Sequence, residues 1–319
     1  MRFLVVFLIG ISFCVFAFSQ TGAFHYSHYL KGVFYLQKGN FSSALKELEK
    51  ARQNAPQSIY IRLKIAACLI RLEKLEKAEK ELKEIKKISP DNIDASLALI
   101  FLYSYAKKDK ELEEEYEEFL KKIHRLRPQD LRISEYLAQY YFYKEKPQEA
   151  IKLYEAIIEK KPDYAEGLFW LGYLYEEVGE REKAVQMWKK ALKAEPNHAP
   201  ALNSLGYIYA EEGINLDEAE EMIKKALEVE PQNGAYLDSL GWVYFKKGNY
   251  QKAEEFLKKA IGFLKDPVIY EHLGDLYIKM DNIEEAIRYY KEGVDNFPDN
   301  KNLKEKLKKY ERKDKILKN

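Results

Sequence analysis

Cysteine is scarce in this chain of 319 residues, which contains only Cys14 and Cys68. Cys14 lies in an apolar, leader-like segment at the N-terminus, so Cys68 is the only thiol expected in the mature chain. An intrachain disulfide is thereby excluded, and stability has to come from packing. Cys68 lies in the apolar run 65–70, where we expect it to be a buried, small hydrophobic side chain.

Proline and glycine are also few, at 10 and 15 residues, and Leu, Ala, Glu, Lys and Tyr dominate between them. This composition is typical of long helices with charged outer faces and disfavours strands. Neither sign of charge predominates, since the chain has 53 basic and 52 acidic residues. Nucleic-acid-binding domains are usually strongly basic, so the balance argues against that class of protein.

Long hydrophobic runs are absent apart from residues 3–18, which follow the single positive charge of Arg2. The sequence Ala17-Phe18-Ser19 resembles the small-x-small pattern that precedes a cleavage site. We therefore predict that residues 1–19 are a signal peptide, that the mature chain begins at about Gln20, and that it is exported to the periplasm or cell envelope. The alternative is an uncleaved anchor, although the run is shorter than the roughly 20 residues that span a bilayer.

Catalytic motifs are absent as well. The sequence contains no Gly-rich phosphate loop, no Gly-x-Ser-x-Gly and no His-Glu-x-x-His. His25 and His28 are three residues apart and could share a helical face, but no third metal ligand lies near them. We therefore expect a protein that is not an enzyme and has no cofactor, metal or small-molecule substrate.

What the sequence does contain is an internal repeat. Prolines recur with a period of about 34 residues, at Pro56, Pro90, Pro128, Pro162, Pro196 and Pro231. Aligning the chain on that period superimposes a small residue in seven units: Gly32, Ala66, Ala138, Gly172, Gly206, Gly241 and Gly274. An alanine column follows twelve or thirteen residues later: Ala44, Ala78, Ala150, Ala184, Ala219, Ala253 and Ala286.

These columns predict a helical hairpin in each unit. Apolar residues recur at helical spacing, as at Leu168, Leu171 and Tyr175, and give one face of a first helix. Glycines such as Gly179 and Gly213 then mark the turn, because they adopt the left-handed conformation that ends a helix. The small residues of the two columns allow the paired helices to approach closely.

The spacing resembles that of the tetratricopeptide repeat family, most clearly in Leu171-Gly172, Tyr175, Ala184 and Pro196. The resemblance implies an all-α solenoid, a right-handed superhelix of helix-turn-helix repeats. We divide residues 25–300 into eight units, followed by a terminal covering helix at 301–319. The unit limits are 25–58, 59–92, 93–130, 131–164, 165–198, 199–233, 234–266 and 267–300.

Three segments depart from the pattern. The third unit has 38 residues, so we expect a lengthened helix there with the acidic run 109–118 as its solvated face. The sixth unit has one extra residue near 214–216, which indicates a longer turn. Residues 301–319 carry nine basic and three acidic side chains. We expect them to cover the last unit, with contact to an anionic membrane surface as the lesser alternative.

The resemblance implies a concave groove lined by the first helix of each unit. The family's groove positions predict a partner-binding set that is mostly aromatic: Phe101, Tyr105, Phe142, Tyr143, Phe169, Tyr173, Glu176, Tyr207, Asp238, Trp242 and Phe245. The acidic residues at such positions are Glu135, Glu166, Glu176, Glu177, Glu211, Asp238, Glu271 and Asp275. We expect a partner segment with apolar anchors and Lys or Arg. The alternative is that some of these aromatics pack between neighbouring first helices.

The sequence therefore predicts a non-catalytic protein–protein interaction scaffold of the cell envelope, with protein partners and no nucleic acid. Contact with a membrane is expected only through an uncleaved signal or the basic C-terminal helix. The alternative function is a non-catalytic subunit or regulator of an enzyme complex that acts on envelope polymers.

Overall fold

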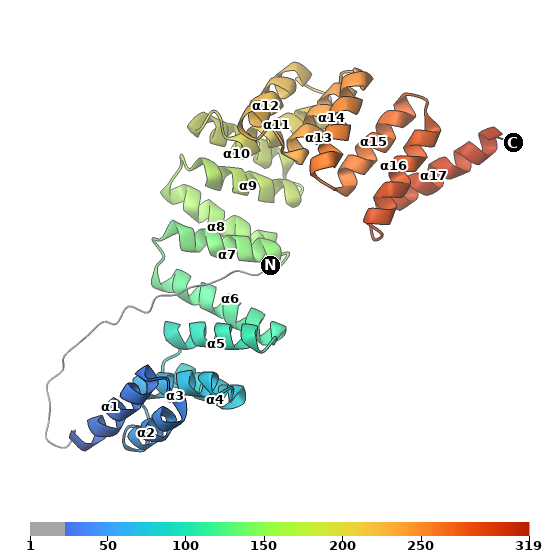
Figure 1. The fold of residues 1–319 in the computed structure, drawn as a ribbon. Coiled ribbons are helices and arrows are strands. Elements are labelled where there is room, and N and C mark those ends of the chain that lie inside the picture. The colour runs from blue at the N-terminus through green and yellow to red at the C-terminus, as the bar shows by residue number, and fades with distance from the viewer. Residues whose placement is uncertain (1–22, 319) are drawn as a thin grey trace. The chain divides into compact units, whose positions relative to one another are not determined.

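A computed structural model describes the backbone of residues 23–318 and the side chains of residues 26–316 (Figure 1). The predicted signal peptide and the side chain of His25 lie outside these residues. Within the described backbone every regular element is an α-helix and there is no strand, which confirms the all-α prediction. No helix in residues 23–318 combines the length and apolar character needed to cross a bilayer.

The chain divides into two compact units, of which unit 1 ends at Ile133. Successive helices of unit 1 pack as antiparallel pairs, α1 on α2, α3 on α4 and α5 on α6, and each pair packs on the next. Cys68 is fully buried in the core of this unit, as predicted. The helices are α1 (Ala23–Gln37), α2 (Phe41–Asn54), α3 (Ile59–Arg71), α4 (Leu75–Ile88), α5 (Ile93–Tyr105) and α6 (Asp109–Leu126).

Unit 2 begins at Ser134. Its helices continue the paired arrangement, with α9 on α10, α11 on α12, α13 on α14 and α15 on α16. They are α7 (Leu131–Tyr143), which crosses the unit boundary, α8 (Pro147–Lys160), α9 (Ala165–Glu177), α10 (Arg181–Ala194), α11 (Ala199–Glu212), α12 (Leu216–Val229), α13 (Gly234–Lys246), α14 (Tyr250–Phe263), α15 (Pro267–Lys279), α16 (Ile283–Asn296) and α17 (Lys301–Lys318). The predicted limits of the individual repeats stay predictions.

The small-residue columns lie where the two helices of a hairpin cross. A Cβ placed on Gly206 of α11 would lie 2.8 Å from Cγ1 of Ile223 and 3.1 Å from the backbone oxygen of Ala219 on α12. The first distance is shorter than real Cβ contacts and the second is tighter than most of them, and Ala219 is itself fully buried. The close helix approach expected from the sequence is therefore confirmed at this crossing.

The turns inside the hairpins contain a residue whose backbone has the left-handed conformation, with positive φ. Glycine takes that conformation at Gly39, Gly179, Gly213 and Gly248, with φ between 69° and 78°. In other hairpins the residue is not glycine but Glu73, Lys107, Glu145 or Asp281. The turn after α11 has a second left-handed residue, Asn215, which accommodates the extra residue predicted near 214–216.

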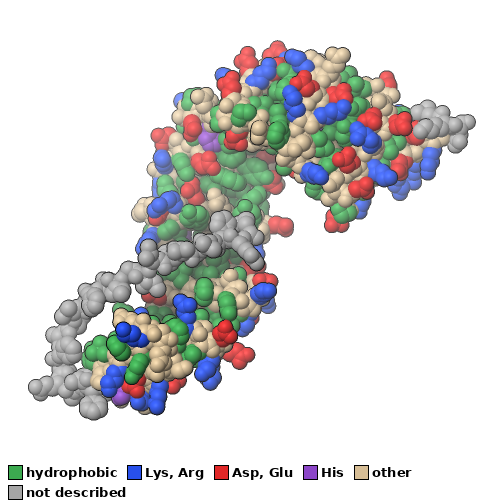
Figure 2. Space-filling view, viewed as in Figure 1, with side chains coloured by type: hydrophobic (Ala, Val, Ile, Leu, Met, Phe, Trp, Pro, Cys, Tyr) green, Lys and Arg blue, Asp and Glu red, His purple; other side chains and the backbone are tan. Residues whose placement is uncertain are grey.

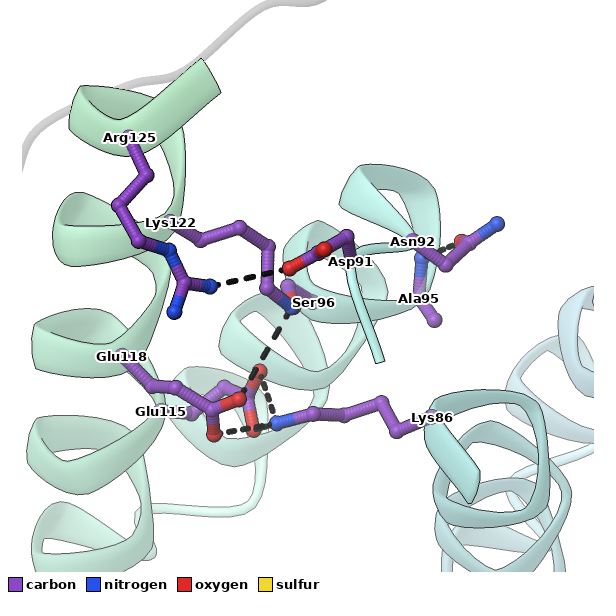
Figure 3. Close-up of polar contacts among 9 residues, drawn as sticks. All are labelled: Lys86, Asp91, Asn92, Ala95, Ser96, Glu115, Glu118, Lys122 and Arg125. Atoms are coloured by element: carbon purple, nitrogen blue, oxygen red, sulfur yellow. Dashed lines mark hydrogen bonds and ion pairs between the residues drawn. The ribbon is translucent and has the colours of Figure 1, made fainter. Parts of the chain in front are cut away.

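Helix α6 is longer than its counterparts, at 18 residues against 14 for α4, as predicted for the third unit. The expectation that its acidic run is simply a solvated face is wrong at Glu115, which is only 7% exposed. The Glu115 carboxylate accepts hydrogen bonds from Nζ of Lys86 on α4 at 2.7 and 2.9 Å (Figure 3). An acidic residue of α6 is thus turned towards a lysine of the preceding hairpin.

Helix α6 also carries a buried lysine, Lys122. Its side chain is 1% exposed, and Nζ donates a hydrogen bond to Oγ of Ser96 on α5 at 3.0 Å (Figure 3). Nζ of Lys122 also forms an ion pair with Glu118, whose carboxylate oxygen lies 3.9 Å away. Burial lowers the pKa of Lys122 because the charged ammonium is removed from water.

Helix α17 packs on α16 at the end of unit 2. Leu303 is fully buried, and the ring of Tyr310 stacks on that of Tyr290 with centroids 5.7 Å apart. Nζ of Lys306 lies 2.6 Å from a carboxylate oxygen of Glu271 and 2.6 Å from one of Asp275, both on α15. One basic residue of this helix therefore pairs with two acidic residues of the array.

Candidate protein-interaction surface

The predicted partner-binding residues all lie on odd-numbered helices, which are the first helices of their hairpins. In unit 1 they are Phe101 and Tyr105 of α5, one helical turn apart. Each is 59% exposed, and their rings stack with centroids 6.5 Å apart. These two side chains form a small exposed aromatic pair.

In unit 2 the structure brings predicted residues of two helices together. Phe142 of α7 lies with its ring centroid 5.6 Å from that of Tyr173 on α9, nearly perpendicular to it. Trp170 of α9 completes the group, at 6.2 Å from Phe142 and 5.9 Å from Tyr173, and Phe169 lies 5.6 Å from Trp170. We call Phe142, Phe169, Trp170 and Tyr173 the α7–α9 patch.

The α7–α9 patch is half-buried, so part of each ring remains accessible. Figure 2 shows hydrophobic side chains gathered over α7 and α9. Tyr143 extends the patch, because its ring lies 6.0 Å from that of Phe142 and it is 78% exposed. Trp170 was missed from the sequence because it stands one position after a groove position. Glu166 lies four residues before Trp170, so the two side chains share one face of α9, and this spacing could have indicated Trp170.

Two carboxylates border the α7–α9 patch. Glu166 accepts a hydrogen bond from Nε1 of Trp170 at 2.8 Å, and its other oxygen lies 3.1 Å from Nε2 of His198. The His198 hydrogen bond is the main reason that the pKa of Glu166 is lowered. The exposed Glu177 is hydrogen-bonded to the hydroxyl of Tyr173, whose pKa is raised by burial and by this carboxylate.

A second aromatic group in unit 2 is a stack of three rings, Phe245, Trp242 and His272, which we call the ring stack. The centroid of Trp242 lies 4.5 Å from that of Phe245 and 3.9 Å from that of His272, with nearly parallel planes. Tyr207 of α11 lies 6.4 Å from His272. The ring stack therefore joins side chains of α13 and α15, with α11 alongside.

Polar contacts hold the ring stack in place. The carboxylate of Asp238 lies 2.9 Å from Nδ1 of His272, and Nε1 of Trp242 donates to Glu211. Asp238 and Trp242 are only 6% and 8% exposed. Burial assigns Trp242 to packing between first helices, the alternative that the sequence left open for the aromatics, and Asp238 is buried with it.

Glu176, the remaining acidic member of the predicted set, is paired within its own hairpin. Its carboxylate accepts hydrogen bonds from Nε of Arg181, at 3.0 and 3.3 Å. Arg181 begins α10 and its pKa is raised by the Glu176 hydrogen bond. The carboxylate is therefore neutralised locally, in contrast to Glu166 and Glu177.

The described residues contain no group of three or more His, Cys, Asp or Glu side chains that could hold a metal ion. His28, which the sequence singled out, pairs with Glu47 at 2.6 Å.

Comparisons with known proteins agree with this architecture. A tetratricopeptide repeat family model matches residues 35–100 and 141–206, and a model described as anaphase-promoting complex, cyclosome, subunit 3 matches residues 212–293. No curated protein is significantly similar in sequence. The chain is a tetratricopeptide repeat protein, and this family generally forms non-enzymatic scaffolds that bind proteins.

Solved structures share the fold at low sequence identity. The chain is similar to one in the APC/C hetero-tetramer Cut9–Hcn1, with TM-score 0.57 and 17% identity, over 85% of this chain and 52% of that one. It is 22% identical to TTC0263, a thermophilic tetratricopeptide protein of Thermus thermophilus, over 56% of this chain and 98% of that one, with TM-score 0.49. A tetratricopeptide protein of Parabacteroides merdae is 18% identical over 90% and 98% of the two chains, with TM-score 0.46. The first likeness supports the helical-repeat solenoid fold.

Proposed function

We propose that this chain is a non-catalytic scaffold of the cell envelope that binds segments of partner proteins along the first helices of unit 2. The observation that carries the proposal is the α7–α9 patch, in which half-buried rings of two successive first helices meet beside Glu166 and Glu177. Aromatic side chains dominate the energetics of protein interfaces, and flanking charges fix the orientation of a partner.

The location in the envelope rests on the N-terminal sequence. Arg2, the apolar run 3–18 and the small residues at its end are typical of a signal peptide. Fractionation of the source cells and N-terminal sequencing of the purified chain test this part of the proposal. We expect a mature chain in the envelope fraction that starts near Gln20, and a cytoplasmic chain with an intact N-terminus would contradict it.

Site-specific photo-crosslinking tests the surface itself. A benzoylphenylalanine at Tyr143, which is 78% exposed beside the α7–α9 patch, should crosslink to a defined partner. The matched control is the same group at Phe263, which is 55% exposed at the end of the second helix α14. Equal crosslinking at both positions, or none at Tyr143, would contradict the proposal. The identity of the partner separates a scaffold from a subunit of an enzyme complex.

A further inference from the structure

The rings of the α7–α9 patch present a surface suited to a cation. The face of an aromatic ring carries partial negative charge and attracts ammonium and guanidinium groups within about 6 Å of its centroid. The four rings lie at angles of 45° to 80° to their neighbours, so their planes point in different directions. Because each of the four rings is only half-buried, part of its surface is accessible to a cation.

Glu166 adds a carboxylate that no lysine or arginine of the described residues pairs with. Nδ1 of His198 accepts the backbone N–H of Ala201 at 3.3 Å, so the proton of a neutral imidazole is on Nε2, which faces Glu166. Trp170 is the other donor, and its indole carries no charge. The Glu166 side chain is 48% exposed, so a charged carboxylate with a set orientation remains open to a partner.

Among the described residues, no lysine or arginine covers the rings of this patch. Elsewhere in unit 2, lysines cover aromatic rings, as Lys183 does at 5.1 Å from the centroid of Tyr175 and Lys246 at 5.1 Å from that of Trp242. Within the described part of the chain, no lysine or arginine lies over any ring of the α7–α9 patch. The patch therefore differs from its neighbours in lacking an internal cation.

Another first helix of the same unit shows how such a surface is occupied. On α15, Glu271 and Asp275 stand one turn apart and together bind Nζ of Lys306. Lys306 belongs to α17, which follows the α15–α16 hairpin in the chain. On α9, Glu166 and Trp170 also stand one turn apart, but His198, next to the start of α11, takes that place. Within the described residues, no cation from the chain reaches Glu166 as Lys306 reaches Glu271 and Asp275.

We infer that the α7–α9 patch and Glu166 form a receptor for an arginine side chain that a basic segment of the partner protein presents. The inference rests on the proposed function and specifies the chemistry of the partner. Arginine suits the site better than lysine, because its planar guanidinium stacks on aromatic rings and pairs with carboxylates through two parallel hydrogen bonds. Glu177, on the Tyr173 side of the patch, offers a second carboxylate to the same segment.

The three tryptophans of the chain provide the test. Each indole N–H gives its own NMR signal, and only Trp170 lies in the patch, whereas Trp188 donates to the backbone oxygen of Phe169 and Trp242 to Glu211. The mature chain, from residue 20 to 319, is titrated with the peptide acetyl-Leu-Arg-Leu-Arg-Leu-amide. Parallel titrations replace both arginines by citrulline, which is neutral and nearly the same shape, or by lysine or aspartate.

We expect the arginine peptide to shift the Trp170 signal saturably and to leave those of Trp188 and Trp242 in place. The citrulline peptide should bind roughly tenfold more weakly, and Glu166→Gln should weaken binding of the arginine peptide roughly threefold to tenfold. The exposed Glu228→Gln on α12 is the matched control and should bind as the original chain does. Fluorescence anisotropy of a labelled arginine peptide extends the comparison to Trp170→Leu, which should lose binding, and Phe263→Leu, which should keep it.

Equal affinity for the arginine and citrulline peptides would overturn the inference, as would tighter binding of the aspartate or lysine peptide. An unchanged affinity of Glu166→Gln, or failure of the arginine peptide to bind at millimolar concentration, would do the same. None of these results affects the crosslinking at Tyr143. If crosslinking succeeds without arginine preference, the scaffold function stands and the inference fails.

Discussion

The indole of Trp242 lies almost parallel to the imidazole of His272, with ring centroids 3.9 Å apart and planes inclined by 13°. Trp242 belongs to α13 and His272 to α15, so the contact joins two successive hairpins. Asp238 of α13 also reaches His272, and Glu211 of α11 accepts the indole N–H. In a repeat array each hairpin is stabilised mainly by its neighbours, so this contact is an important part of unit 2.

We predict that Trp242→Ala destabilises the protein by about 3 kcal/mol or more, because a nearly buried indole is lost and a cavity is left. Denaturant unfolding followed by circular dichroism measures the loss. Phe101→Ala is the control, since that ring is 59% exposed and its removal should change stability by less than about 1 kcal/mol. A Trp242→Ala variant as stable as the original chain would show that the ring stack carries little of the packing.

The crossing of α11 and α12 gives a second prediction. Gly206→Leu should lower the unfolding free energy by roughly 1 to 3 kcal/mol, because even its Cβ would lie 2.8 Å from Ile223. Gly262 on α14 is the matched control, as nothing lies within 4 Å of a Cβ there. Gly262→Ala should stabilise the helix by roughly 0.5 to 1 kcal/mol. Melting curves that move in the same direction for both variants would contradict this account of the crossing.

The sequence predicted the hairpin because its signal is local and repeated. Gly206 and Ala219 recur at corresponding places in other units, and a helix crossing of fixed geometry needs small residues there. Gly179 likewise marks a turn by its own conformational freedom. These features depend on neighbours within one hairpin, so one unit's pattern predicts them.

The sequence was less informative where side chains of different hairpins meet. Asp238 and His272 are 34 residues apart, as are corresponding positions of any two neighbouring units, so their spacing carries no special signal. Whether an aromatic at a groove position is open, as Tyr143 is, or buried, as Trp242 is, depends on the size of the residues on the adjacent first helices. Burial of Lys122 and Glu115 likewise depends on contacts of the lengthened α6 with Ser96 on α5 and Lys86 on α4.

The left-handed turn residues give a third prediction. Glu73 has φ 57°, a conformation that strains a residue with a Cβ but not glycine. Glu73→Gly should therefore stabilise unit 1 by roughly 0.5 to 1 kcal/mol, although glycine elsewhere usually destabilises. The reverse change, Gly179→Ala at φ 78°, should destabilise unit 2 by a similar amount. Thermal unfolding of both variants decides the matter, and a lower melting temperature for Glu73→Gly would refute the prediction.

Acid stability gives a fourth prediction. Burial opposes ionisation of Glu79, but hydrogen bonds from Lys108 and Lys83 outweigh it and lower the pKa to about 2, from an ordinary value of 4.5. A carboxyl whose pKa is lower in the folded state contributes stability above the unfolded pKa, and loses it as the pH falls through the folded value. Glu79→Gln should therefore cost about 1 to 2 kcal/mol at pH 7 and almost nothing near pH 2.

Unfolding curves of the original chain and Glu79→Gln between pH 2 and pH 7 measure this difference. The exposed Glu228→Gln should show no such trend. A stability difference that stays constant across the range would mean that the ion pairs of Glu79 contribute nothing to folding.

The buried pair of Ser96 and Lys122 gives the last prediction, which concerns one interaction removed in two ways. Ser96→Ala leaves the Lys122 ammonium buried with the Glu118 carboxylate 3.9 Å away, and should destabilise unit 1 by about 1 to 3 kcal/mol. The double change Ser96→Ala with Lys122→Met replaces both polar groups by apolar ones of similar size. It should restore the stability of the original chain or exceed it, because an apolar pair bears no desolvation cost.

The pH dependence of Ser96→Ala distinguishes this cause from a simple packing defect. Burial already lowers the pKa of Lys122, so the folded chain favours the neutral amine more than the unfolded chain does. The cost of the charged ammonium is present below the folded pKa and disappears as the pH rises towards the ordinary value of 10.5. The deficit of Ser96→Ala should therefore shrink in alkali, whereas the double variant should show no such trend. A double variant less stable than Ser96→Ala alone would show that the buried lysine stabilises the hairpin contact by its charge.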